Sequence, residues 1–229
     1  MTFRALVLFD IDGTLVRRAG PHHREALVEG VRRITGLETT TEGIPVQGML
    51  DPDILTIMMR RAGAAPESIH LAMPAIQHAA ECHYERVCPV LRDKHCPGVA
   101  PTLNRLAAHG VLLALVTGNL THIGWRKLER AGLARYFRFG AFGETAPTRA
   151  GLAKAAIREA IGRRLVLPGA AVSLVGDSPA DVAAARRNRI RAVAVKTGIT
   201  PVGELRAAHP DLLLPDLRAL RLEMVDGTL

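Results

Sequence analysis

The sequence predicts an α/β protein that consists of a parallel sheet with an α-helical insertion. Three observations predict this fold. Over residues 97–229, short apolar runs alternate with segments of helical period, which is typical of parallel strands joined by helical crossovers. Another apolar run, residues 5–9, lies near the start of the chain. The stretch between these two regions has a helical pattern almost throughout.

The first predicted strand ends in two carboxylates. Residues 5–9 read as a strand buried on both faces, and Asp10 and Asp12 follow it directly. Two carboxylates at a strand end repel each other, and Mg²⁺, which prefers carboxylate and phosphate oxygens, would balance them. Gly13 and Thr14 then turn the chain and offer N–H groups and a hydroxyl that suit a phosphate. The alternative is an acidic turn that binds nothing.

The next part of the chain predicts a bundle of helices. Apolar positions repeat at helical spacing over residues 22–34, after Asp51, and over residues 69–87. Asp51 is expected at the N-cap of the second helix, with Pro52 at its first position. We therefore expect an α-helical cap at residues 16–96 and a Rossmann-like core formed by residues 1–15 and 97–229.

The remaining elements alternate between helix and strand. A helix that begins near Val99 is expected to stop at Gly110, because glycine favours helix C-terminal ends. The elements expected after it are a strand at 111–116, a helix at 121–131, a strand at 137–142, a helix at 149–161, a strand at 171–175, a helix capped by Ser178, a strand at 192–195 and an edge strand at 212–214.

Polar motifs follow two of these strands. Strand 111–116 leads into Thr117, Gly118 and Asn119, and strand 171–175 leads into Gly176, Asp177 and, four residues on, Asp181. Without the first motif, the simplest interpretations are a strand-to-helix turn and a helix cap.

Taken together, these motifs resemble those of the haloacid dehalogenase superfamily, closest to its branch of phosphoglycolate-phosphatase-like enzymes. The pattern Asp-x-Asp-Gly-Thr begins at Asp10, the second-motif threonine is Thr117, and Gly-Asp-x-x-x-Asp begins at Gly176. The resemblance covers essentially the whole chain. It implies a cap of the C1 class, which is inserted between the first two motifs and closes over the active site.

The resemblance also implies a role for each motif residue. Asp10 is expected to attack phosphorus and form an aspartyl-phosphate, with Asp12 as general acid and then base. Asp10, Asp12 (through its backbone carbonyl) and Asp177 are expected to hold Mg²⁺. Asp181 is expected to orient Asp177 or the cationic phosphate binder. The residues expected to bind phosphate are Gly13, Thr14, Thr117, Gly118, Asn119 and Arg149.

The third motif of the family, usually a lysine, leaves two candidates. Arg149 precedes a predicted helix where the family's cation is expected, and arginine can bind phosphate through two N–H groups. Lys154 lies more than one helical turn further on. We favour Arg149, and expect Arg149→Ala to lose far more activity than Lys154→Ala.

The cap residues bear on the substrate. Gly48, Met49, Leu50 and Asp51 stand where related phosphatases often have Gly-Lys-Thr-Asp. The missing lysine argues against phosphoglycolate, unless other cap cations replace it; the candidates are Arg17, Arg18, His22 and His23.

Composition excludes several classes of protein. The net charge is +8, but the arginines occur in scattered pairs and aromatic residues are only 3%, so no nucleic-acid partner is expected. No apolar run approaches the roughly 18 residues that span a membrane, and no secretory pattern is present, so a cytoplasmic protein is expected. The stretch 78–96 holds three cysteines and three histidines, without a compact zinc motif.

The sequence thus predicts a Mg²⁺-dependent phosphatase of small phosphorylated metabolites, with phosphoglycolate as one candidate substrate. Two alternatives remain at this point. One is a phosphoryl-transfer mutase resembling β-phosphoglucomutase, and the other is a non-catalytic binding protein on the same fold. The sequence does not indicate an oligomeric state.

Overall fold

The fold is built on one parallel sheet, described for residues 2–226 in a computed structural model. Within these residues, six strands lie in the order β3-β2-β1-β4-β5-β6, and every neighbouring pair is parallel. The strands are Phe3–Phe9 (β1), Val111–Val116 (β2), Gly140–Ala141 (β3), Val166–Gly176 (β4), Arg191–Val195 (β5) and Leu212–Leu214 (β6). β1 is central, with β2 and β4 on either side. The predicted α/β class with a parallel sheet is confirmed.

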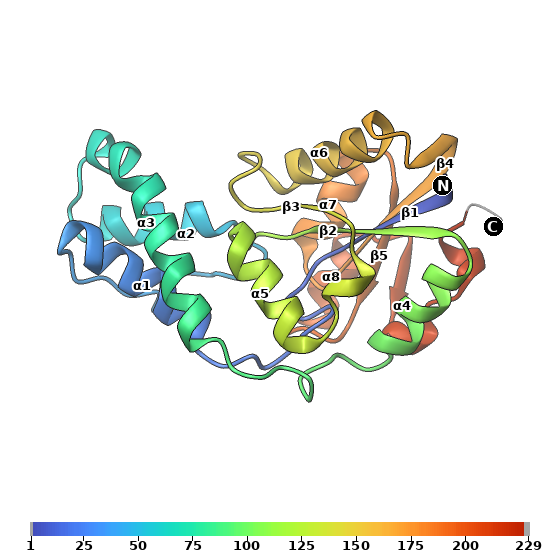
Figure 1. The fold of residues 1–229 in the computed structure, drawn as a ribbon, viewed down its shortest axis with the longest axis horizontal. Helices are drawn as coiled ribbons and strands as arrows, with labels where there is room; N and C mark the ends of the chain where they lie inside the picture. Colours follow the sequence, from blue (N-terminus) through green and yellow to red (C-terminus); the bar gives the residue numbers. More distant parts are fainter. Residues whose placement is uncertain (1, 227–229) are drawn as a thin grey trace.

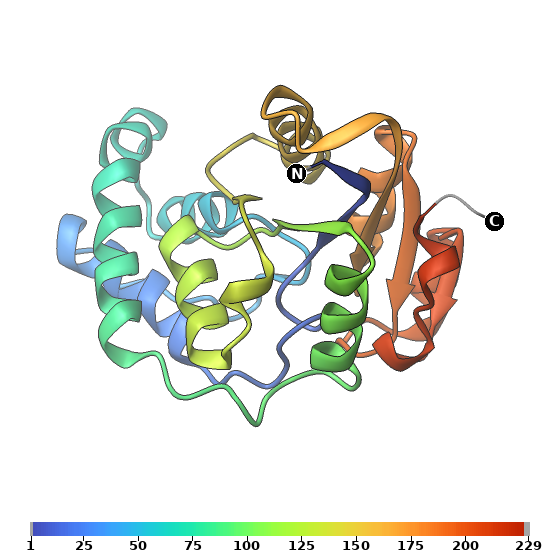
Figure 2. The ribbon, with the colours of Figure 1, turned by 45° about the vertical axis from the view of Figure 1, so that its right-hand side comes forward.

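Helices cover both faces of this sheet (Figures 1 and 2). Alternate side chains of β1 enter two separate apolar clusters, as the two-residue period of a strand requires. Val7 and Phe9 join the cluster that contains α4 and α5, whereas Leu6 and Leu8 join the one that contains α6 and α7. The helices of the core are α4 (Val99–Ala108), α5 (Thr121–Ala131), α6 (Arg149–Gly162), α7 (Pro179–Arg187) and α8 (Val202–Ala207), with 3₁₀ turns at Ala134–Tyr136, Leu217–Ala219 and Leu222–Met224.

Three inserted helices lie beside the sheet, beyond the carboxyl end of β1 (Figure 1). They are α1 (His22–Thr35), α2 (Asp51–Arg61) and α3 (Pro66–Val87). α1 packs closely on α3 at Gly30, where an added Cβ would lie 2.8 Å from the backbone oxygen of Ile76. We refer to α1, α2 and α3 below as the inserted helices.

Several predicted elements have different bounds in the structure. The strand expected at 137–142 is reduced to β3, whereas the strand expected at 171–175 extends back to Val166. The short helix α8 was not expected. Asp51 is the first residue of α2 and not its N-cap, because its carboxylate accepts hydrogen bonds from His23 and from the backbone of Leu120.

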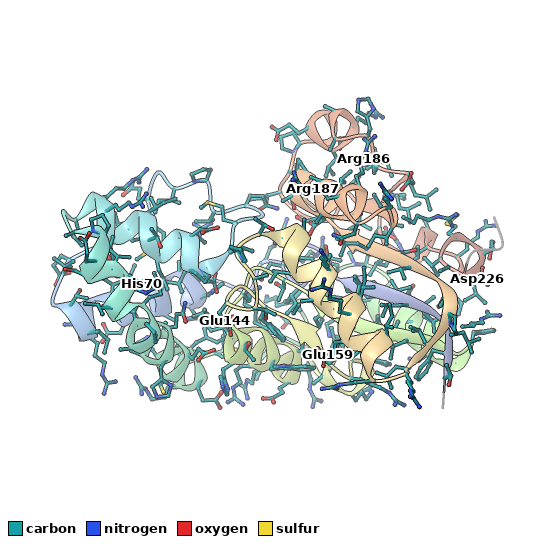
Figure 3. The ribbon with its side chains drawn as sticks, turned by 90° about the horizontal axis from the view of Figure 1, so that it is seen from above. His70, Glu144, Glu159, Arg186, Arg187 and Asp226 are labelled. Carbon is teal, nitrogen blue, oxygen red and sulfur yellow. The ribbon has the colours of Figure 1, made fainter. Side chains whose placement is uncertain are left out.

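Charged side chains of both signs occupy the outside of the molecule. Figure 3 labels examples on separate elements: His70 on α3, Glu159 on α6, and Arg186 and Arg187 on α7. Among residues 2–226, no helix is both long enough and apolar enough to cross a membrane.

Candidate active site

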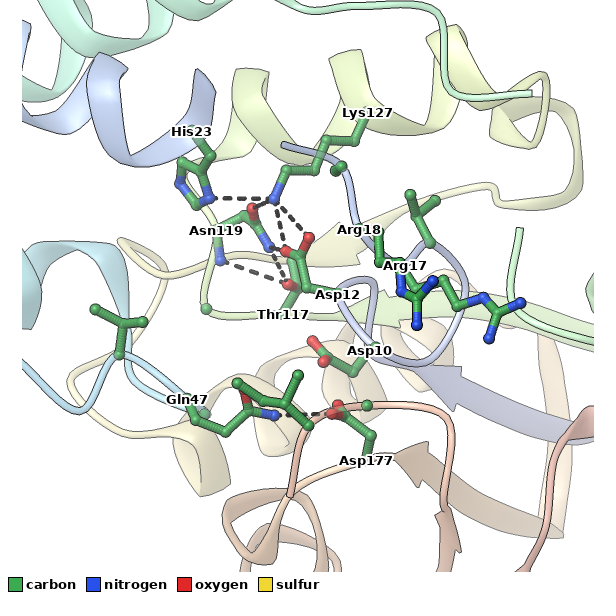
Figure 4. A pocket seen from close by; sticks show the side chains of 18 of the residues that line it. Asp10, Asp12, Arg17, Arg18, His23, Gln47, Thr117, Asn119, Lys127 and Asp177 are labelled. Carbon is green, nitrogen blue, oxygen red and sulfur yellow. Dashed lines mark hydrogen bonds and ion pairs between the residues drawn. The ribbon is translucent and has the colours of Figure 1, made fainter. Parts of the chain in front are cut away.

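The three strand-end motifs meet because their strands are in register. The last residue of β1 pairs with Leu115 of β2 and with Val175 of β4. Asp10, Thr117 and Asp177 therefore follow strand ends at one edge of the sheet, where ligands of open parallel sheets bind. All three line a cavity of about 810 Å³ between the core and the inserted helices (Figure 4).

Three buried carboxylates gather at this edge. An oxygen of each of Asp10, Asp177 and Asp181 lies within 4.8 Å of an oxygen of the other two. Arg149, the first residue of α6, donates from Nη1 to Oδ1 of Asp10 at 3.1 Å and to Oδ1 of Asp181 at 2.7 Å. One guanidinium does not balance three carboxylates, so the cluster is short of positive charge.

Burial and mutual repulsion both raise the pKa values of Asp10 and Asp177. Burial raises the pKa of Asp10 although Arg149 opposes it, and burial together with the neighbouring Asp10 raises the pKa of Asp177. The backbone leaves room for the Asp177 carboxylate at two glycines: an added Cβ would lie 2.3 Å from its Oδ2 at Gly13 and 1.6 Å from it at Gly198. Buried carboxylate oxygens that lack a counter-charge are a donor set that fits Mg²⁺.

Asp12 has different surroundings from Asp10. Its two oxygens accept hydrogen bonds from Nζ of Lys127 at 2.8 and 2.6 Å, and one of them also accepts from Nδ2 of Asn119 at 2.8 Å. Enclosure by the protein raises the pKa of Asp12, but the charge of Lys127 and the hydrogen bonds from Lys127 and Asn119 outweigh it, so the net shift is downward. Asp12 is therefore held as an ionised carboxylate, with 45% of its side-chain surface exposed to the cavity.

The second motif forms the wall beside Asp12. Nδ2 of Asn119 also donates to Oγ1 of Thr117 at 2.7 Å, which ties the two side chains together. Gly118 touches the inserted segment so closely that an added Cβ would lie 2.1 Å from the backbone oxygen of Met49. Gly118 and Asn119 line the cavity, as does Gly13.

Thr14 and Asp181 lie behind this surface. Thr14 is fully buried outside the cavity lining, and its Oγ1 has no hydrogen-bond partner among the described residues. Asp181 closes a capping box with Ser178 at the start of α7 and also accepts from Arg149. Asp181 therefore caps α7, as the simplest interpretation of this motif predicted, and it also contacts the cationic Arg149.

A comparison with known families identifies the chain. A family model described as haloacid dehalogenase-like hydrolase matches residues 5–188. The chain belongs to the haloacid dehalogenase-like hydrolases. The expected resemblance is thereby confirmed, as is the prediction of an enzyme of this type.

Relatives of this hydrolase include curated phosphoglycolate phosphatases. The chain is 30% identical to the one from Pseudomonas savastanoi over 94% of its length and 78% of the relative. It is 31% identical to the one from Agrobacterium fabrum, over 94% of its length and 90% of the relative.

Solved structures share the fold at low sequence identity. CbbY from Rhodobacter sphaeroides, in complex with xylulose-(1,5)bisphosphate, has a TM-score of 0.71 and 19% identity, with 98% of this chain and 100% of that chain covered. A β-phosphoglucomutase from Clostridium difficile has a TM-score of 0.66 and 14% identity, with 97% and 95% covered.

The two candidates for the cationic motif of the hydrolase have different positions. Arg149 is buried against Asp10, whereas Lys154 is exposed one turn along α6. The geometry therefore brings Arg149, and not Lys154, to the carboxylates.

The structure also adds residues that the sequence analysis did not single out for the site. Lys127 of α5 contacts Asp12, and Gln47 donates from Nε2 to Oδ2 of Asp177 at 2.8 Å. A signal for Lys127 was available, because it lies on the buried face of α5 with Ile123 and Leu128, where a lysine is unexpected.

The cysteines and histidines of residues 78–96 do not form a second centre in the described part of the chain. Sγ of Cys82 lies 3.6 Å from Nε2 of His78, and no third ligand joins them. All three cysteines are free thiols.

Proposed function

We propose that this hydrolase is a Mg²⁺-dependent phosphatase that cleaves small phosphate monoesters through an aspartyl-phosphate on Asp10. One observation carries the proposal: Asp10 lies buried between a guanidinium and two further carboxylates, while Asp12 faces the same cavity in an ionised, hydrogen-bonded state. A phosphate ester needs both an in-line nucleophile and neutralisation of its negative oxygens.

The residues divide this chemistry between them. Asp10 would attack phosphorus, and Arg149, which already contacts Asp10, would bind the phosphoryl oxygens. Thr117 and the backbone N–H groups near Gly118 would donate to the same oxygens. Asp12 would protonate the leaving oxygen and then take a proton from the attacking water.

Mg²⁺ would be held by the carboxylates of Asp10 and Asp177 and by the backbone carbonyl of Asp12. When bound, it would offset the negative charge of the phosphoryl group and of its nucleophile. The donor set supports this assignment, because the carboxyl cluster lacks positive charge.

The cavity supports a substrate with a second anionic group. Four further basic side chains line it, and no ion pair among the described residues neutralises them: Arg17, Arg18, Arg24 and Lys196. Figure 4 shows Arg17 and Arg18 on the side of Asp10 opposite Gln47. Phosphoglycolate, the substrate in the names of the relatives, carries a carboxylate that these cations would suit. They would replace the lysine that the segment around Met49 lacks.

The test is phosphate release from a panel of monoesters with and without Mg²⁺. The panel contains phosphoglycolate, sugar phosphates, nucleotides and ethyl phosphate, which lacks a second anion. We expect turnover that requires the metal, that favours esters with a second anion, and that Asp10→Asn abolishes. Asp53→Asn, on the exposed side of α2, is the matched control and keeps full activity. Isomerised sugar phosphate without free phosphate would instead indicate a mutase.

A further inference from the structure

Lys127 is a buried lysine in the wall of the active-site cavity. Its side chain is 1% exposed, and Nζ lies within 2.6–3.1 Å of acceptors on three residues: Asp12, Asn119 and His23. A buried ammonium is strongly unfavourable unless it is paired and hydrogen-bonded. Here all of its partners belong to the cavity and none to the apolar core, so its position serves the site.

Lys127 fixes the orientation of the Asp12 carboxylate. It donates to both carboxylate oxygens, and Asn119, which itself accepts from Lys127, donates to one of them. Three hydrogen bonds from two directions leave the carboxylate a single orientation. Because 45% of the Asp12 side chain remains exposed, the oriented carboxylate stays open to the cavity that Asp10 also lines (Figure 4).

His23 links Lys127 to the inserted helices. Nδ1 of His23, on α1, lies 3.1 Å from Nζ of Lys127, and Nε2 of His23 lies 2.8 Å from Oδ2 of Asp51 on α2. An ammonium can only donate, so Nδ1 accepts and Nε2 carries the proton that Asp51 accepts. The same oxygen of Asp51 accepts from the backbone N–H of Leu120 in the core.

We propose that Lys127 is a positioning residue that holds Asp12 for the second half of the reaction, and that His23 steadies Lys127 from the inserted helices. This inference rests on the proposed function. In that step the oxygen of a water molecule bonds to phosphorus, the bond from phosphorus to Asp10 breaks, and Asp12 takes the proton of the water. Free phosphate and the Asp10 carboxylate result. A misplaced Asp12 slows this step most, whereas formation of the intermediate from an ester with a good leaving group needs little help from it.

The experiment is rapid-mixing kinetics of Lys127→Met with 4-nitrophenyl phosphate and Mg²⁺, with acid-trapped phosphoprotein counted in parallel. We expect kcat to fall about 10²-fold, the scale of a lost general base. We also expect a burst of nitrophenolate that approaches one per active site, because the intermediate then accumulates. Lys94→Met is the matched control, since Lys94 pairs only with the exposed Asp93, and it behaves as wild type.

The outcomes separate this inference from the proposed function. Wild-type protein that releases no phosphate from any ester of the panel and traps no phosphoprotein would refute the phosphatase itself. Active wild type together with Lys127→Met of unchanged kcat, or of reduced kcat without a burst, would overturn the role of Lys127. If Lys127→Met does not fold by circular dichroism, His23→Leu, compared with His70→Leu on the exposed face of α3, provides the same test. An accumulated intermediate supports the proposal, and its absence contradicts it.

Discussion

Arg149 pairs with two carboxylates and still keeps one of its nitrogens without a partner among the described residues. Its Nη1 serves both Asp10 and Asp181, yet its buried Nε has no partner among the described residues. A buried N–H without a partner is costly, so its donor is available to an oxygen that is bound only during the reaction. The fixed fork of a guanidinium suits the oxygens of a phosphoryl group.

The first prediction concerns this residue. Arg149→Ala should lower kcat/KM by about 10²–10³-fold, since it removes a preorganised donor to the phosphoryl group. Lys154→Ala, on the exposed side of the same helix, should change it by less than about twofold. Initial rates with the best substrate of the panel measure both variants. A larger loss in Lys154→Ala would show that the third-motif cation has been assigned to the wrong residue.

At the residue scale, the sequence predicted the candidate site residues that directly follow strands. Asp10, Thr117 and Asp177 were singled out because they follow predicted strands in motifs that resemble those of the family, and they lie together because a parallel sheet aligns the ends of its strands. Lys127 and His23 were not connected to them, because each reaches the site from a helix whose rotation and packing no local pattern specifies. The contacts of Lys127 with Asp12 and with His23 join residues that are 115 and 104 positions apart in the sequence.

At the scale of elements, the segment that leads into α2 contacts the core through several of its residues. Gln47 bonds Asp177, the backbone of Met49 packs on Gly118, and the Asp51 N–H donates to the carbonyl of Gly118 at 2.8 Å. These contacts bring part of the insertion onto the edge of the sheet that carries the carboxyl cluster. A substitution at Gly118, on the core side of the contact with Met49, should therefore disturb the site without altering a charged group.

The second prediction uses this close approach. Gly118→Ala places a Cβ 2.1 Å from the backbone oxygen of Met49, so the segment must shift. Overpacking of this kind costs about 1–3 kcal/mol, and we expect both a lower Tm and a loss of activity. Gly162→Ala, at the end of α6 with no atom near the added Cβ, should be neutral or should stabilise by about 0.4–1 kcal/mol. Equal Tm values for the two variants would contradict the close contact between Gly118 and the backbone of Met49.

The elements themselves were predicted unevenly, for a physical reason. Helices α1, α5 and α6 were found within a residue or two, because glycines and apolar periodicity mark them. The strand expected at 137–142 was too long, because the aromatic residues at its two ends, Phe137 and Phe142, are buried without belonging to the ladder. Only Gly140–Ala141 pairs with β2, and the backbone hydrogen bonds just before it, at Arg138 and Phe139, do not extend the paired strand. Burial alone produces the same apolar pattern as a paired strand.

At the scale of the whole molecule, the carboxyl cluster works against the stability of the metal-free protein. Asp10 and Asp177 bind protons more tightly in the folded chain than in the unfolded chain, where carboxyl pKa values are about 4. Between a pH of about 4 and the pKa of about 8 of Asp177, the folded state therefore holds more protons than the unfolded state. Stability must fall as the pH rises through this window. The lowered pKa of Asp12 affects the stability only at pH values below this window.

Mg²⁺ should reverse this trend, because it binds the ionised carboxylates and displaces their protons. At about 100 times its Kd the metal should stabilise the protein by about 2.7 kcal/mol, which raises the Tm by roughly 5–10 °C. The increase should be larger at pH 8 than at pH 5, where protons compete for the same oxygens. Thermal unfolding in EDTA and in Mg²⁺ across this range measures it, with Asp177→Asn as the variant in which the metal-dependent increase disappears. An increase of the same size at both pH values, or one that Asp177→Asn retains, would mean that the cation stabilises the protein at some site other than this cluster.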